Sequence, residues 1–422
     1  MSKVKVYRYP NGAKIIYVED KDAEFTYFTG EFKVGAVDEQ KGKEGVAHFL
    51  EHMAFKSTTN MSEYERRKTL NIMCVNNNAY TGPYSISFVC SSLNELFNEG
   101  FKIYIDGVTN CKFDKGEVNK ERKVILEEYK RGLSNPNRIA GRLGYRKMYK
   151  NSEFSHDIIG TKTSIQKISV NDLKEFYQKF TPDKFTIYGG GKMRASQYKK
   201  LMEKYLGKFL FMKDFKSIPQ PIEEPIEKPK FYALNKDNAQ TQVVLQMNIF
   251  NFYDLRKAAL TYIDAAMNDA GGRLYVEARD KQGLLYNIGT NHGLNENCGW
   301  LALGFGCISD NVPKVLAIFK NCLKDIATNG LDKDEFQKIK NTIKVRLANA
   351  KISLNRKINN AYRDVRFNGC LLKDKERYAE LEKVTNEDIK QVAQYLLDNQ
   401  SYVIVGVGKG ITQKHLESYK KA

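Results

Sequence analysis

A repeat across the two halves constrains the fold of this 422-residue chain more than any other feature of its sequence. The segment at 113–117, Phe-Asp-Lys-Gly-Glu, returns 218 residues later as Leu-Asp-Lys-Asp-Glu at 331–335. The segment at 168–174 returns at 384–390, and each copy leads through a helical stretch into a Gly-containing strand. Two copies of one unit each need their own core, so two homologous domains are expected.

A proline-rich stretch at 218–229 separates the two copies and holds four of the nine prolines of the chain. Proline without glycine or serine favours an extended, semi-rigid linker. We therefore predict one domain over 1–217, a linker over 218–229 and a second domain over 230–422. Both halves alternate strands and helices in a strand, strand, helix order, which indicates the α+β class.

The clearest chemical motif is His-Phe-Leu-Glu-His at 48–52, which uses two of only five histidines in the chain. On a helix, residues four apart share a face, so His48 and His52 can bind one Zn²⁺ together. Glu51 points near the same side and can take a proton from water at an open metal position. The alternative is a helix whose histidines cap or hydrogen-bond within the fold.

A second acidic helix is expected around Glu121–Tyr129, with Val124 and Ile125 facing inward. Glu121 and Glu128 lie two turns apart on one face, whereas Glu127 is rotated away from it. One carboxylate completes a His₂Glu ligand set, and the other can hold a ligand histidine from outside. Taken alone, this pattern also fits a solvated acidic face.

The stretch 45–58 resembles the zinc helix of the pitrilysin family of inverted zinc peptidases, in the branch of mitochondrial processing peptidase and its bacterial relatives. The resemblance extends over the whole chain, through 9–12, 78–81, 121–128 and 279–286. It implies His48, His52 and Glu128 as ligands of one Zn²⁺ per chain, Glu51 as general base and Glu121 as the outer partner. It also implies mostly antiparallel sheets packed with helices, forming half of a clamshell chamber.

The same resemblance implies a set of substrate contacts. Asn78, Ala79 and Tyr80 would line a peptide that adds to an edge strand. Arg279 and Tyr286 would hold the substrate carbonyl and the developing oxyanion, to which a guanidinium and a phenol can donate hydrogen bonds.

The second copy lacks the metal ligands, because Ala266 and Arg346 stand where a shift of 218 places His48 and Glu128. We expect this half to close the chamber and to contribute substrate contacts. In the long members of the family four such domains enclose the chamber, so a two-domain chain must dimerise. The prediction is a homodimer in which Arg279 and Tyr286 act on the partner's zinc site; a heterodimer with a related chain stays open.

Bulk composition favours a cytoplasmic protein that does not enter a membrane. The chain has no run of 18 apolar residues, its start resembles neither a signal nor a transit peptide, and its seven cysteines contain no C-x-x-C pair.

A net charge of +18 raises nucleic-acid binding as an alternative function. However, the lysines are scattered along the sequence, and no nucleic-acid-binding motif is present.

Three functions therefore remain open. The best supported is a metalloendopeptidase that acts on peptides or unfolded segments. The second is a non-catalytic scaffold or partner subunit of the same fold, and the third is a basic nucleic-acid-binding protein. The sequence gives no natural substrate and no cleavage preference.

Overall fold

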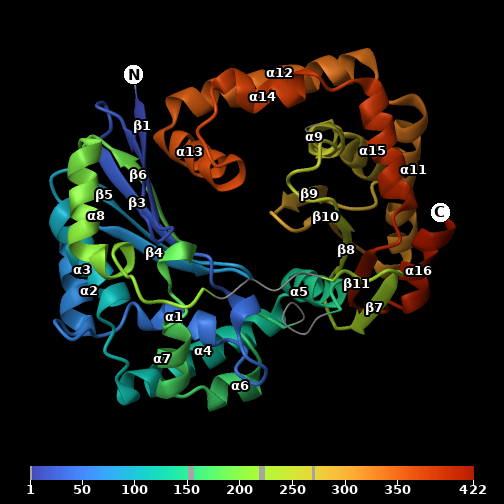
Figure 1. The fold of residues 1–422 in the computed structure, drawn as a ribbon. Helices are drawn as coiled ribbons and strands as arrows, with labels where there is room; N and C mark the ends of the chain where they lie inside the picture. Colours follow the sequence, from blue (N-terminus) through green and yellow to red (C-terminus); the bar gives the residue numbers. More distant parts are fainter. Residues whose placement is uncertain (1, 151–155, 218–223, 269–270) are drawn as a thin grey trace. The chain divides into compact units, whose positions relative to one another are not determined.

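A computed structural model describes residues 2–150, 156–217, 224–268 and 271–422 (Figure 1). The chain forms two compact units, each an α+β layer structure with one sheet, which confirms the predicted fold class. None of the helices in these ranges combines the length and apolar character that crossing a bilayer requires. Of the predicted linker, residues 218–223 lie outside the described residues.

Unit 1 comprises residues 1–130, 156–221 and 348–371. Its six-stranded sheet has the order β1-β2-β6-β3-β5-β4, in which β2 and β6 are parallel and the other pairs antiparallel. Its strands are β1 (Lys3–Arg8), β2 (Lys14–Glu19), β3 (Phe25–Phe32), β4 (Asn76–Thr81), β5 (Ile86–Leu93) and β6 (Phe185–Gly191). Its helices are η1 (Ala36–Asp38), α1 (Val46–Met53), α2 (Glu63–Ile72), α3 (Phe97–Thr109), most of α4 (Lys115–Ser134), α6 (Lys162–Lys167), α7 (Val170–Tyr177), η2 (Pro182–Lys184), α8 (Ala195–Leu210) and α13 (Leu354–Asn368).

Unit 2 comprises residues 131–155, 222–347 and 372–422. Its five-stranded sheet has the order β7-β11-β8-β10-β9, again with one parallel pair, β7 with β11. Its strands are β7 (Lys230–Asn235), β8 (Thr241–Ile249), β9 (Ile288–Leu294), β10 (Gly299–Cys307) and β11 (Tyr402–Gly408). Its helices are α5 (Pro136–Met148), α9 (Lys257–Asn268), α10 (Arg273–Tyr275), η3 (Val276–Asp280), η4 (Ser309–Asn311), α11 (Val312–Asn329), most of α12 (Lys333–Ile352), α14 (Asp374–Glu382), α15 (Asn386–Asp398) and α16 (Gln413–Lys421).

The two sheets share one topology, as the sequence repeat predicts. From β2 to β4 in unit 1, the strand order matches that from β7 to β9 in unit 2, with β1 as an addition. The helices keep the same shift: α4 begins at Lys115 and α12 at Lys333, while α5 begins at Pro136 and α13 at Leu354. Both helix pairs are therefore 218 residues apart.

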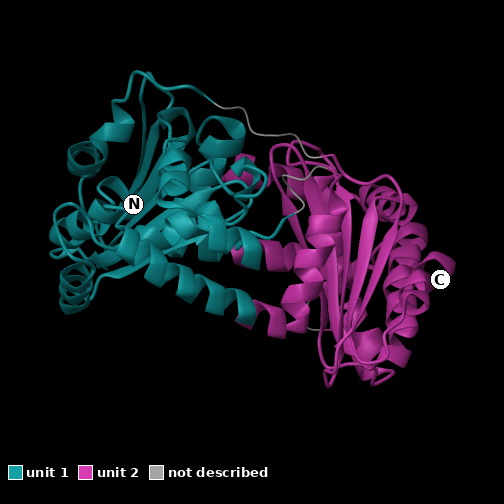
Figure 2. Cartoon of the chain, turned by 90° about the horizontal axis from the view of Figure 1, so that it is seen from below, with its two compact units in different colours: residues 1–130, 156–221, 348–371 teal, residues 131–155, 222–347, 372–422 magenta. Residues whose placement is uncertain are grey.

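The compact units exchange one helix each, which the sequence halves do not show (Figure 2). The first half of the chain contributes α5 to unit 2, where it contacts β8 and β11. The second half contributes α13 to unit 1, where it contacts β2 and β6. Boundaries at 217 and 230 remain a prediction about the repeats, because the compact units draw on both halves.

The sheet of unit 1 packs against different helices on its two faces. One packs against α1, α3 and α8 in a large apolar core that contains Phe28, Phe49 and Phe101. On the other face, Ile16 and Val18 pack under α13, against Ile358, Ala361 and Val365. The contact is close at β6.

Gly190 is the residue that permits this close approach. A Cβ atom there would lie 2.9 Å from the side chain of Ile358 and 2.9 Å from the carbonyl oxygen of Val18. Such distances are shorter than ordinary van der Waals contact, so only glycine fits without a shift of its neighbours.

Candidate metal centre

Helix α1 is fixed at its N-terminus by a buried carboxylate. Gly45 precedes the helix at φ +93°, a conformation that favours glycine. The Glu39 carboxylate accepts hydrogen bonds from the backbone N–H groups of Gly45 (2.9 Å) and Ala47 (2.8 Å). His156 Nε2 lies 2.7 Å from the same carboxylate. Burial raises the pKa of Glu39, although these three partners favour its charged form.

The apolar residues of α1 decide which side faces the acidic helix. Val46, Ala47, Phe49, Leu50 and Met53 are buried in the core of unit 1. This leaves the two histidines and Glu51 on the other side of the helix, as the spacing in the sequence predicts.

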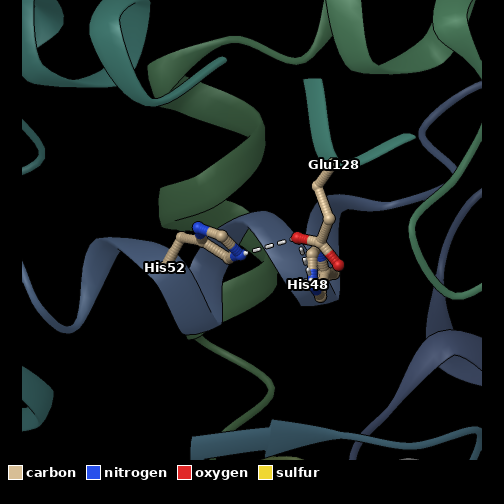
Figure 3. Close-up of side chains that lie close together, drawn as sticks. All are labelled: His48, His52 and Glu128. Carbon is tan, nitrogen blue, oxygen red and sulfur yellow. Dashed lines mark ion pairs between the residues drawn. The ribbon is translucent and has the colours of Figure 1, made fainter. Parts of the chain in front are cut away.

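Three potential metal ligands converge between α1 and α4 (Figure 3). Glu128 Oε2 lies 3.7 Å from His48 Nε2 and 3.6 Å from His52 Nε2. One potential ligand atom from each of the three residues lies within 4.8 Å of the other two. Among the described residues, no other group of three such side chains meets this criterion.

These distances fit a shared zinc ion. Zinc–nitrogen and zinc–oxygen bonds of about 2.1 Å in tetrahedral geometry place two ligand atoms about 3.4 Å apart. The observed 3.6 and 3.7 Å separations are close to that spacing. Two imidazoles and one carboxylate are also a donor set that is common at catalytic zinc.

His52 is held from its other side by a second glutamate. Its Nδ1 lies 2.7 Å from Glu121 Oε1, and Glu121 Oε2 lies 2.6 Å from the Lys56 ammonium. Burial would raise the pKa of Glu121, but the hydrogen bonds with His52 and Lys56 lower it below its ordinary value. Burial would likewise lower the pKa of His52, whereas Glu121 and Glu128 raise it to about 9.

Glu51 lies beside the three ligands and contacts the edge of the sheet. Its Oε2 accepts a hydrogen bond of 2.5 Å from the hydroxyl of Thr81, the last residue of β4. Burial is the main cause that raises the pKa of Glu51, and the charge of Glu128 adds to it. A carboxyl group in such surroundings suits proton transfer near neutral pH.

The other residues of the acidic helix take different positions. Ile125 is buried as predicted, but the prediction for Val124 was wrong, because 49% of that residue is exposed. Val124 lies one position before Ile125 and is rotated by about 100° from it, toward solvent. Glu127 pairs with Lys130 at 2.6 Å, away from the three ligands.

The predicted substrate residues are divided between the two compact units. Strand β4 is the edge strand of the sheet among the described residues and pairs with β5. It contains Asn78, Ala79 and Tyr80. Ala79 is buried, while Asn78 and Tyr80 are exposed. In unit 2, the Arg279 guanidinium lies 5.0 Å from the centre of the Tyr286 ring.

Sequence reasoning missed four residues that support the centre. Thr81 holds Glu51, Lys56 holds Glu121, and Glu39 with His156 holds the start of α1. Thr81 and Lys56 both lie within segments that carry the family resemblance, which was the available signal. Glu39 and His156 gave none, because their contact joins residues that are 117 positions apart.

Helix α1 carries the H-x-x-E-H motif that is typical of inverted zinc peptidases, and it lies in only one of the two repeated units. Comparison with family models agrees. The model described as Insulinase (Peptidase family M16) matches residues 14–162, and the model described as Peptidase M16 inactive domain matches residues 167–343. The chain belongs to peptidase family M16, the pitrilysin family.

Several relatives carry names that fit this family. An uncharacterized zinc protease of Rickettsia bellii (strain RML369-C) is 26% identical over 322 residues, covering 75% of this chain and 76% of the relative. The uncharacterized zinc protease YmxG of Bacillus subtilis (strain 168) is 23% identical over 362 residues, covering 84% and 87%.

Solved structures show the same fold. A peptidase M16 inactive domain from Pseudomonas fluorescens matches with a TM-score of 0.85 at 18% identity, covering 97% of this chain and 99% of that one. A protease from Helicobacter pylori matches with a TM-score of 0.84 at 19% identity, covering 97% and 100%.

Proposed function

We propose that this protein is a zinc-dependent endopeptidase that hydrolyses peptides or unfolded segments. The observation that carries the proposal is the convergence of His48, His52 and Glu128 next to Glu51. The zinc protease names of the relatives support the choice of metal and reaction. His48, His52 and Glu128 would hold one Zn²⁺, which when bound polarises the scissile carbonyl and acidifies water.

The residues of the chain account for the proton transfers. Glu51 takes a proton from the attacking water and then delivers it to the leaving amine. Thr81 orients the Glu51 carboxylate through its hydroxyl hydrogen bond. Glu121 orients His52 through Nδ1, and Lys56 keeps Glu121 charged.

The edge strand β4 is suited to bind the peptide. An extended peptide can pair with an edge strand through main-chain hydrogen bonds, and it would then lie beside Asn78, Ala79 and Tyr80. Because Thr81 ends this strand at the Glu51 carboxylate, a peptide bound along β4 runs toward the proton-transfer group.

Arg279 and Tyr286 are proposed to complete the site of a partner subunit in a homodimer. Their side chains lie together in unit 2, where 75% of Tyr286 is exposed. A chain with Glu51→Gln and a chain with Arg279→Ala should each be inactive but regain activity when mixed. If no activity returns although mixed dimers form, the shared site is excluded.

Metal analysis and cleavage of a quenched peptide library, with and without chelator, test the main proposal. The purified chain should contain one zinc per chain and lose activity with chelator. Glu51→Gln should retain zinc and lose turnover, because only the proton acceptor is removed. Zinc binding without cleavage of any library peptide would instead support a non-catalytic subunit. That alternative is compatible with the inactive-domain description that matches residues 167–343.

A further inference from the structure

The unit 1 sheet has a groove between its edge strand β4 and α13. The groove lies on the face that α13 covers in part, not on the face that packs against α1. Its volume is about 440 Å³, and its lining runs from Asn76 and Tyr80 on β4 across the sheet to α13. This volume lies in the range of sites that bind small ligands or side chains. All of the lining residues belong to unit 1.

The strand register explains how the floor of the groove forms. Asn76 pairs with Ser91, which pairs with Tyr27, so these three side chains form one row across β4, β5 and β3. Val89 pairs with Thr29, which pairs with Tyr188, and these form the next row on the same face.

Helix α13 supplies the wall of the groove. Asn355, Ile358 and Asn359 are spaced three and four residues apart and therefore share one face of this helix. Ile358 is buried against the sheet, while the two asparagines are exposed. The wall thus presents amide groups beside an anchored aliphatic side chain.

The lining is aromatic and uncharged. Tyr27, Tyr80 and Tyr188 contribute three phenol rings, and Tyr188 is fixed by stacking on Tyr362 with ring centroids 4.1 Å apart. Among the described residues that line the groove, none is acidic or basic, although the chain carries a net charge of +18. A charged occupant would lose hydration without gaining a partner there, whereas an aromatic ring can pack on the tyrosines.

The groove is continuous with the strand that leads to Glu51. Thr81, at the end of β4, bonds to Glu51, and Asn76 at the start of β4 lines the groove. Five residues of strand span roughly 17 Å, and a paired peptide has a similar rise per residue. In a peptide paired with β4, the residues about two to six positions from the scissile bond would therefore lie beside the groove. Every second one of these residues would direct its side chain to the face that holds the groove.

We propose that this groove binds an aromatic side chain of the peptide substrate, distant from the scissile bond, and thereby sets substrate preference. The inference rests on the proposed peptidase function. The three tyrosines pack on the ring, and Asn76, Asn355 and Asn359 offer hydrogen bonds to a phenol hydroxyl.

The test uses the full-length zinc-loaded protein and a series of quenched peptides with one fixed scissile bond. Tyr, Ala, Glu or Lys is placed in turn at each position from two to six residues away, on both sides. The preference should appear on only one side of the scissile bond, at one position or at two alternate positions. There, kcat/KM should be at least about tenfold higher with Tyr than with Glu or Lys. A shorter peptide that cannot reach the groove should show no such preference.

Two variants on α13 locate the effect. Asn359→Trp should fill the groove from its exposed wall, remove the preference and leave cleavage of the short peptide unchanged. Asn368→Trp is the matched control, because it makes the same change at an exposed asparagine at the far end of the same helix. It should keep the preference.

A binding measurement separates the two proposals. Glu51→Gln protein should bind a labelled Tyr-containing peptide about tenfold more tightly than its Glu counterpart, and adding Asn359→Trp should abolish the difference. Cleavage without any positional preference, or a preference that survives Asn359→Trp, would overturn the groove assignment alone. Selective binding without cleavage would support the groove and overturn the peptidase proposal.

Discussion

Lys56 and His52 contact different oxygens of one carboxyl group, that of Glu121: the Lys56 Nζ atom lies 2.6 Å from Oε2 and the His52 Nδ1 atom 2.7 Å from Oε1. The two contacts do not compete, because each involves a different oxygen of the Glu121 carboxyl group. The imidazole is thereby fixed with Nε2 directed at Glu128. This chain of contacts makes the orientation of one ligand depend on residues outside the ligand set.

Glu121→Gln should lower zinc affinity roughly 10- to 100-fold, because an amide cannot accept hydrogen bonds on both sides as the carboxylate does. Competition with a chromophoric chelator measures the affinity. Glu127→Gln is the control, because Glu127 lies on the same helix and pairs with Lys130 instead of a ligand histidine. Equal zinc affinity in Glu121→Gln and wild type would contradict the supporting role.

Glu39→Gln should destabilise unit 1 by about 1–3 kcal/mol, because one backbone N–H of α1 then faces an amide donor instead of an oxygen. Urea denaturation followed by fluorescence measures the change. Glu99→Gln, which alters an exposed pair with Lys102, should have little effect. An unchanged denaturation midpoint for Glu39→Gln would show that this cap is dispensable.

The attachment of α13 should weaken in acid. The hydrogen bond from Lys357 lowers the pKa of Asp20 below its ordinary 3.8. A group with a lowered folded pKa contributes stability above its unfolded pKa and loses it as the pH falls through the folded value.

Asp20→Asn should therefore cost stability at pH 7 and progressively less as the pH falls below 4. Urea midpoints of both proteins across this range measure the difference, with the exposed neighbour Asp22→Asn as control. A difference between Asp20→Asn and wild type that does not vary with pH would exclude a charged contribution.

Gly190→Ala should destabilise the α13 contact by about 1–3 kcal/mol, because the added methyl group would meet Ile358 and the Val18 carbonyl at 2.9 Å. Gly141→Ala in α5 is the matched control, since nothing lies within 4 Å of a Cβ at that position. It should be neutral or stabilising by up to about 1 kcal/mol. Thermal denaturation compares the two, and an equal response would mean that the sheet and α13 adjust freely.

Much of the candidate metal site could be predicted from the spacing of residues in the sequence. The positions of His48, Glu51 and His52 follow from helix periodicity, and the repeat predicted two sheets of one topology. The partner of each side chain was harder to predict, because the hydrogen bond between Thr81 and Glu51 joins residues 30 positions apart. Periodicity can show that Ile358, Ala361 and Val365 share a buried face, but it cannot show that they pack on the sheet of the other half.

The exchange of α5 and α13 has a consequence for biosynthesis. As the chain leaves the ribosome, the strands of the unit 1 sheet are complete long before residues 348–371 exist to cover Ile16 and Val18. Until then the nascent first half exposes an apolar surface that a chaperone or another chain could bind. Cutting the gene between the repeats would therefore yield two fragments, each without one helix of its compact unit. Each fragment would expose apolar surface and be prone to aggregate until the two associate.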